Sequence, residues 1–169
     1  MLSERLLSEL NKQVQFEFAS ANLYLAMAAY CASEDFPGFA NFFRVQAEEE
    51  RFHAMKFFDY IIERDGRVAI GGIEAPDNNY SSLLDVFKKG FEHEKTVTKR
   101  IYLLSDIAMD EREHATMSLL KWFIDEQVEE ESTFNGIIKK LERMGDNPNA
   151  LFMLDAELAQ RVFTPPATA

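Results

Sequence analysis

The chain has 169 residues, of which 47% are hydrophobic and 28% are charged, and its formal net charge is −11. This size and composition predict one globular domain over residues 1–169, and the acidic balance argues against nucleic-acid binding through a basic face. No apolar run is long enough to span a bilayer, and the single cysteine, Cys31, excludes an internal disulfide and a four-cysteine iron–sulfur or zinc centre.

The first two predicted helices are long and amphipathic, with apolar residues at alternating spacings of three and four. The first should cover about residues 4–32, with Ser3 as its N-cap, and the second about residues 39–65, after the break at Phe36-Pro37-Gly38. The N-terminal stretch is amphipathic and carries acids, so it does not match a signal peptide. Together with the single cysteine, it predicts a cytoplasmic protein.

Two further long helices and one short helix follow. The third should begin after Ser81 or Ser82 and reach about residue 109. The fourth should cover about residues 113–144 and stop at Gly145, and Asn147-Pro148 should start a short fifth helix over about residues 149–161. The tail Thr164-Pro165-Pro166 is expected to be irregular.

The connection at residues 66–80 is long and shows no helical pattern. A helix of about 27 residues is roughly 40 Å long, and about 15 extended residues can span ~50 Å. The segment can therefore return the chain along the whole bundle, so that the third helix runs parallel to the second. The sequence predicts an all-α four-helix bundle over about residues 4–144, with a long crossover and a short fifth helix.

Each long helix carries one glutamate near the middle of its apolar stripe: Glu17, Glu50, Glu94 and Glu130. With the predicted directions, these acids fall at one level of the bundle, within about two turns. Burying four carboxylates without cations is strongly unfavourable. Acids that converge with a histidine on a bundle core form the ligand set of a carboxylate-bridged di-metal site.

Glu50 and His53 form a Glu-x-x-His pair, whose side chains lie on one helix face and can share one metal ion. The pair stands between Phe43 and Phe57 on the stripe. By itself it also fits a solvated acid beside a core histidine, but the three other buried acids favour a metal site.

Several nearby residues admit two interpretations. Tyr24 is either a core aromatic residue with a bonded hydroxyl or a hydrogen-bonding or redox-active neighbour of the metals. Three acids lie beside the stripes, and spacing alone favours surface charge for them: Glu49, Glu126 and Glu129. His93 is predicted to be a surface histidine, and Trp122 is a candidate for a subunit contact.

The chain resembles the ferritin family over almost its whole length, most closely the bacterial non-haem ferritins. The resemblance rests on residues that match in order and spacing: Glu17, the Glu50/His53 pair, Glu94, Asp125-Glu126-Gln127 with Glu130, and Tyr80-Ser81-Ser82-Leu83. It implies a ferroxidase that oxidises Fe(II) with oxygen or peroxide. It also implies storage of Fe(III) mineral in a hollow homo-oligomeric cage of 24 subunits, with the fifth helices gathered at fourfold axes.

The resemblance also implies roles for individual residues. Glu17 and His53 would hold the first iron and Glu50 would bridge. Glu94 and Glu130 would hold the second iron, with Gln127 as a hydrogen-bonding neighbour. Glu49, Glu126 and Glu129, sharing Glu130, would form a third iron site, which replaces the surface-charge interpretation.

Two departures separate the chain from other ferritins. Bacterioferritins carry a haem-ligating methionine after the first glutamate of the pair and a second Glu-x-x-His on the fourth helix. Arg51 and Gln127 stand at the corresponding positions here, so no haem is expected. Animal ferritins guide iron through threefold channels with acidic residues, and Met117 and Leu120 replace these here.

Three rival functions are less compatible with the sequence. A di-iron oxidase of organic substrates usually has two Glu-x-x-His pairs and a larger chain. A storage subunit without oxidation activity would lack part of the ligand set. A metal-free helical interaction module would not bury four carboxylates.

Overall fold

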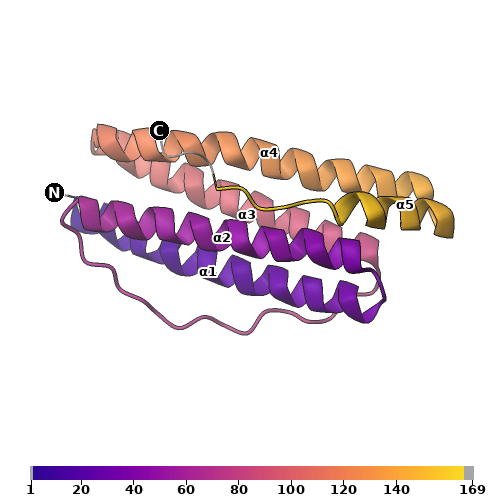
Figure 1. Ribbon diagram of the computed structural model, residues 1–169. Coiled ribbons are helices and arrows are strands. Elements are labelled where there is room, and N and C mark those ends of the chain that lie inside the picture. The colour runs from indigo at the N-terminus through magenta and orange to yellow at the C-terminus, as the bar shows by residue number, and fades with distance from the viewer. Residues whose placement is uncertain (1, 166–169) are drawn as a thin grey trace.

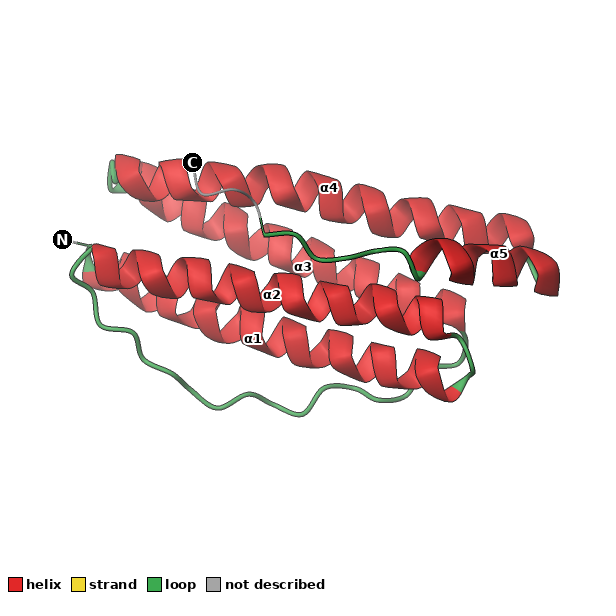
Figure 2. Cartoon of the chain, viewed as in Figure 1, coloured by secondary structure: helices red, strands yellow, loops and turns green. Residues whose placement is uncertain are grey.

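The computed structural model describes residues 2–165, which form five α-helices and no strands. The helices are α1 (Glu4–Ser33), α2 (Pro37–Glu63), α3 (Leu83–Asp110), α4 (His114–Met144) and α5 (Pro148–Leu158). The four long helices lie side by side, and α5 lies beside the C-terminal end of α4 (Figures 1 and 2). The predicted all-α bundle with a short fifth helix is confirmed. Within residues 2–165, none of the helices has the length and apolar character that a membrane crossing requires.

The helix boundaries follow local signals closely. The hydroxyl of Ser3 accepts a hydrogen bond from Leu6 N at 3.0 Å, and the hydroxyl of Ser82 accepts one from Asp85 N at 3.0 Å. α2 begins at Pro37, two residues earlier than predicted. Proline is accepted at this position because the backbone N–H that it lacks would have no partner in the first turn of a helix. Glu113 caps α4 instead of starting it, since its carboxylate accepts a hydrogen bond from Thr116 N at 2.8 Å.

α5 ends at Leu158, earlier than the predicted residue 161, because the chain then turns onto α2. The Asn41 side chain of α2 donates to the carbonyl oxygens of Leu158 at 3.1 Å and Arg161 at 2.9 Å. The following segment runs along the bundle between α2 and α4 (Figure 1). Thr164 and Pro165 have no regular structure, as expected, and Pro166 lies outside the described residues.

The crossover comprises residues 64–82 and follows α1 along the bundle (Figure 1). The Asn11 side chain donates to Arg67 O at 3.2 Å and accepts from Ala69 N at 2.7 Å, and the Gln15 side chain donates to Gly72 O. These bonds hold the crossover on α1. α3 consequently starts at the same end as α2 and runs parallel to it, as predicted.

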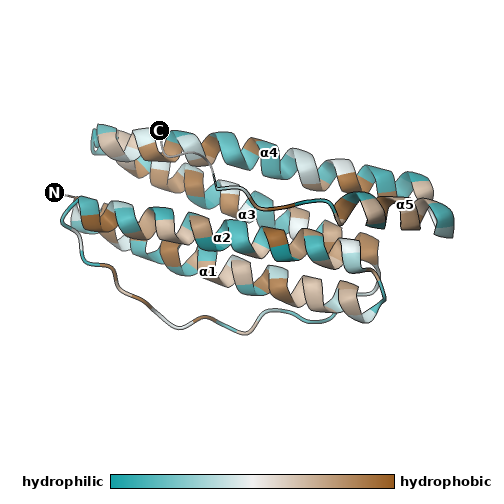
Figure 3. Cartoon of the chain, viewed as in Figure 1, coloured by the Kyte–Doolittle hydropathy of each residue, from teal (hydrophilic) through white to brown (hydrophobic). Residues whose placement is uncertain are grey.

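The core consists of two apolar clusters at opposite ends of the bundle. One contains Phe39, Phe43, Phe87 and Phe134 with the buried residues of α5, and the other contains Leu10, Phe57, Ile101 and Phe123. Brown apolar and teal polar positions alternate along the long helices (Figure 3), as expected for helices with one buried face.

Between the two clusters lie eight buried polar residues, here termed the polar belt: Gln13, Glu17, Gln46, Glu50, His53, Glu94, Gln127 and Glu130. All four long helices contribute to it. The polar belt therefore lies across the middle of the bundle, with one apolar cluster on each side of it.

Candidate metal centre

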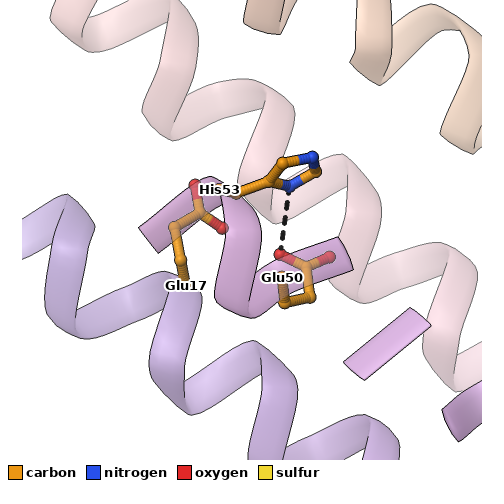
Figure 4. Close-up of side chains that lie close together, drawn as sticks. All are labelled: Glu17, Glu50 and His53. Atoms are coloured by element: carbon orange, nitrogen blue, oxygen red, sulfur yellow. Dashed lines mark ion pairs between the residues drawn. The ribbon is translucent and has the colours of Figure 1, made fainter. Parts of the chain in front are cut away.

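Three potential ligands from α1 and α2 come together in the polar belt. One oxygen of Glu17, one oxygen of Glu50 and a ring nitrogen of His53 all lie within 4.8 Å of one another. The His53 Nδ1 atom is 3.5 Å from Glu50 Oε2. Figure 4 shows Glu17 reaching from α1 towards the Glu50/His53 pair on α2. A single ion that binds each of its donors at about 2.0–2.2 Å would fit among these three atoms.

The two remaining carboxylates enter from α3 and α4. Glu94 is fully buried, and it accepts hydrogen bonds from the Tyr24 hydroxyl and from Gln127 Nε2, the latter at 3.0 Å. Glu130 accepts a hydrogen bond from Gln46 Nε2 at 2.8 Å. These two acids lie outside the three-residue group, but after burial, the main cause, their charges also raise the pKa of Glu50.

A third glutamine completes the pattern on the α1 side. Gln13 Nε2 donates to Glu17 Oε1 at 2.8 Å, and both side chains are fully buried. Three of the four belt carboxylates thus each receive an amide hydrogen bond, whereas Glu50 stands next to His53 instead. A carboxylate that accepts one fixed hydrogen bond keeps its second oxygen oriented for another partner.

Burial dominates the electrostatics of the belt. It raises the pKa of Glu17, Glu50 and Glu130 well above the usual value, and the neighbouring carboxylates raise these pKa values further. Burial also raises the pKa of Glu94 to about 7, although the hydrogen bonds from Tyr24 and Gln127 act in the opposite direction. Without cations, the belt therefore resists holding four negative charges.

Unpartnered atoms test whether metal ions fit this site. Glu17 Oε2 and Glu50 Oε2 are buried and accept no hydrogen bond, although His53 Nδ1 lies 3.5 Å from Glu50 Oε2. Such atoms cost free energy unless a partner is supplied. The donors are carboxylate oxygens and one imidazole nitrogen, a set that suits iron and other divalent cations of intermediate hardness. The residues therefore fit a metal centre.

The acids of the expected third site are arranged differently. Glu49 Oε2 accepts a hydrogen bond from Arg161 Nη2 at 2.6 Å, and Arg161 follows α5. Glu126 is half-buried and Glu129 is exposed on α4. Burial raises the pKa of both Glu49 and Glu126. The structure thus brings an arginine, and not a further acid, onto Glu49.

The structure gives His93 surroundings that differ from the sequence-based expectation, and the subunit contact predicted for Trp122 stays a prediction. His93 is only partly exposed, because its ring stacks on Phe16 with centroids 5.3 Å apart and its Nε2 is 2.7 Å from the Ser20 hydroxyl. Trp122 is partly exposed; its ring centroid lies 5.5 Å from that of His53, and Lys56 Nζ lies 4.6 Å from the centre of its ring. Both lie close to the polar belt. The spacing of residues along a single helix could not reveal this, because it depends on how the helices pack together.

Comparisons with known proteins agree with this architecture. The ferritin model, described as a ferritin-like domain, matches residues 7–144. Over 163 residues, the chain is 48% identical to bacterial non-heme ferritins of Staphylococcus epidermidis and Staphylococcus aureus, covering 96% of this chain and 98% of each relative.

Two solved structures are also similar. One is an engineered closed form of the Archaeoglobus fulgidus ferritin, with a TM-score of 0.95 and 45% identity over 97% of this chain and 100% of that chain. The other is an open-pore ferritin from the same archaeon, with a TM-score of 0.95 and 44% identity over 96% of this chain and 100% of that chain.

Proposed function

The chain belongs to the ferritin family, and from that premise we propose that it stores iron by oxidising Fe(II) at the polar belt. The Fe(III) product is held as mineral inside a hollow cage of 24 copies of the chain. The observation that carries the proposal is the convergence of Glu17, Glu50 and His53 within 4.8 Å, with two buried carboxylate oxygens left unpartnered. The family resemblance inferred from the sequence is confirmed, and the reaction and its residues are proposals.

In this proposal Glu17 and His53 bind the first Fe(II), Glu50 bridges, and Glu94 and Glu130 bind the second. Charge supports the assignment, because two divalent ions balance four ionised carboxylates. The raised pKa of Glu94, about 7, means that this carboxyl holds a proton in part of the metal-free protein near neutral pH. Fe(II) binding displaces that proton, so uptake is favoured as pH rises.

Reduction of one oxygen molecule to hydrogen peroxide takes two electrons and two protons. Two neighbouring Fe(II) ions supply the electrons and become Fe(III). The belt residues keep both ions close in a site sealed by the apolar clusters. Gln13, Gln46 and Gln127 donate to ligand carboxylates without adding charge. Tyr24 donates its hydroxyl hydrogen to Glu94, so it belongs to the same network.

A third iron site at Glu49, Glu126 and Glu129 is part of the proposal. It is supported by a cavity of about 140 Å³ whose lining includes Glu49, His53 and Glu126, whereas Glu129 is exposed on α4 outside that lining. The cavity adjoins the His53 side of the belt, where product iron could leave. Arg161 holds Glu49 Oε2, so binding of an ion through that oxygen competes with the ion pair.

Assembly and setting complete the proposal. Phe152 and Met153 on α5 are 68% and 75% exposed in the single chain, which supports burial of α5 against neighbouring copies. Residues 1–169 act as one domain. The single cysteine, Cys31, is a buried free thiol, which suits a reducing cytoplasmic compartment.

Replacing His53 with alanine tests the centre. We expect the initial Fe(II) oxidation, followed by absorbance after oxygen addition, to slow by at least about tenfold, because losing a ligand should cost no less than losing a residue that orients one. The assembly should stay intact. The matched control is His114→Ala, which removes an exposed histidine. Wild-type kinetics in His53→Ala would overturn the assignment. A wild-type protein that binds Fe(II) without oxidising it would instead identify a storage subunit.

A further inference from the structure

The glutamine beside Glu17 differs from the other two glutamines of the polar belt. Its own oxygen is held by a charged group, because Arg100 Nε of α3 donates to Gln13 Oε1 at 2.9 Å. Gln46, which bonds Glu130, has a buried amide oxygen without a partner. A continuous line of hydrogen bonds therefore runs from Arg100 through Gln13 to Glu17.

This line of hydrogen bonds determines which way the Gln13 amide faces. A guanidinium has only donors, so the amide must turn its oxygen towards Arg100. The amide nitrogen then faces Glu17 and donates to Oε1 at 2.8 Å. A flipped amide would set its oxygen against the carboxylate, where two acceptors repel. Arg100 therefore excludes the flipped orientation.

Arg100 is itself held in place at the side of the bundle. Its guanidinium carbon lies 4.4 Å from the centre of the Phe16 ring, and Phe16 stacks on His93. The arginine is half-buried, so it joins the bundle surface to the fully buried Gln13 and Glu17. Such a contact limits the rotamers of a long side chain and keeps its donor aimed at the amide.

We propose that Arg100 and Gln13 are positioning residues for Glu17, which together hold its Oε1 and leave Oε2 free for the first metal ion. Glu17 Oε2 is the buried oxygen without a partner. The inference deepens the proposed function and rests on it, since it concerns the same Fe(II) site. Partners that orient a ligand in this way typically change metal affinity by about 10- to 100-fold when removed.

The test uses Co(II) as the metal probe, added without oxygen to the assembled protein and followed by its visible absorption. The spectral component lost in His53→Ala identifies the first position. Arg100→Met removes the donor but keeps an unbranched side chain over Phe16, and Gln13→Leu removes the amide. The matched control is Lys99→Met, which removes an exposed positive charge from the adjacent position on α3.

We expect Arg100→Met to weaken Co(II) binding at the first position by about tenfold and Gln13→Leu by about 10- to 100-fold. The double variant should bind no more weakly than Gln13→Leu, because Arg100 acts through the amide. In Fe(II) oxidation, Arg100→Met should raise the KM for Fe(II) more than it lowers kcat. A merely structural role would lower stability without this split.

Equal Co(II) affinities in Arg100→Met and Lys99→Met, or additive losses in the double variant, would overturn the inference. If Arg100→Met does not assemble, Arg100→Lys provides the test, since an ammonium can still donate to Gln13 with poorer geometry. It should bind Co(II) several-fold more weakly than wild type, and unchanged binding would overturn the inference. Failure of the wild-type protein to oxidise Fe(II) would contradict the proposed function alone, because Co(II) affinity is measured without oxidation.

Discussion

Burial and hydrogen bonding act in opposite directions on the Glu94 carboxyl. Burial prevails and raises its pKa to about 7, despite hydrogen bonds from Tyr24 and Gln127 that lower it. Because the folded-state pKa is the higher one, folding takes up a proton at intermediate pH. The stability that this group contributes is fully present below its unfolded pKa, about 4.3. It is lost as the pH rises through about 7.

We therefore expect Glu94→Gln to stabilise the metal-free protein at pH 8 and to have little effect at pH 4. The gain at pH 8 should be up to about 3–4 kcal/mol per subunit, or roughly 6–16 °C in Tm. Thermal melts by circular dichroism at the two pH values measure it. A lower Tm for the variant at pH 8 would contradict the electrostatic explanation, whereas iron oxidation should fall in either case.

The four acids proposed as ligands could be predicted as candidates because each interrupts an apolar stripe, a pattern visible within one helix. Their amide partners could not be assigned in the same way. Gln46 and Gln127 bond carboxylates on other helices, so their spacing to the nearest acid points to the wrong partner. Gln13 lies one turn before Glu17, and that spacing was an available signal. Its link to Arg100 depends on how α1 meets α3.

At the scale of helices, close packing of α3 against α4 depends on Gly90. A Cβ atom there would lie 2.4 Å from Phe134 Cε1, and Phe134 is fully buried. Phe134 also packs on Tyr24, with ring centroids 5.9 Å apart. A larger residue at this position would therefore disturb both the apolar cluster and the residue that bonds Glu94.

We expect Gly90→Ala to destabilise the protein by about 1–3 kcal/mol, even though alanine favours helix. Gly136→Ala on α4 is the matched control, because a Cβ atom there meets nothing within 4 Å. That control should gain about 0.5–1 kcal/mol from helix propensity. Thermal melting of both variants measures the difference, and equal effects would show that α3 and α4 separate easily at Gly90.

Helix ends were predictable where a local residue determines them and less so where tertiary contacts do. Ser3 and Ser82 cap their helices through their own hydroxyls. The end of α5 depends on Asn41, more than a hundred residues away in the chain, which binds the carbonyl oxygens that follow. No spacing in the sequence links that asparagine to the C-terminal segment.

The same C-terminal segment affects the proposed third iron site. Arg161 and Glu49 are both about a quarter exposed, at 24% and 21%, so solvent weakens their ion pair. We expect Arg161→Gln to bind the third Co(II) equivalent about fivefold more tightly, which corresponds to roughly 1 kcal/mol. Anaerobic calorimetry measures this affinity.

Lys140→Gln is the control for Arg161→Gln, because it breaks an ion pair between α4 and α5 that lies apart from the acids in question. The control should leave all Co(II) affinities unchanged. An Arg161→Gln protein with wild-type affinity for the third equivalent would mean that Glu49 does not bind that ion.

For the whole molecule, the exposed apolar residues of α5 separate a single chain from an assembled one. We expect the double substitution Phe152→Asp and Met153→Asp to shift the protein from the proposed cage to smaller species. Charged side chains would then have to be buried between copies. Sedimentation velocity measures the change. Thr133→Asp, at an exposed polar residue of α4, is the control and should assemble normally.

The crossover sets a lower limit on the length of the chain. Residues 64–82, about 19 in number, reach roughly 60 Å when extended, whereas the return along α2 needs about 40 Å. About six residues could therefore be deleted before the segment becomes too short to make this return. If more were deleted, the α3–α4 hairpin could no longer lie beside the α1–α2 hairpin of its own chain. It could then complete a bundle only with the hairpin of another copy, giving a domain-swapped pair.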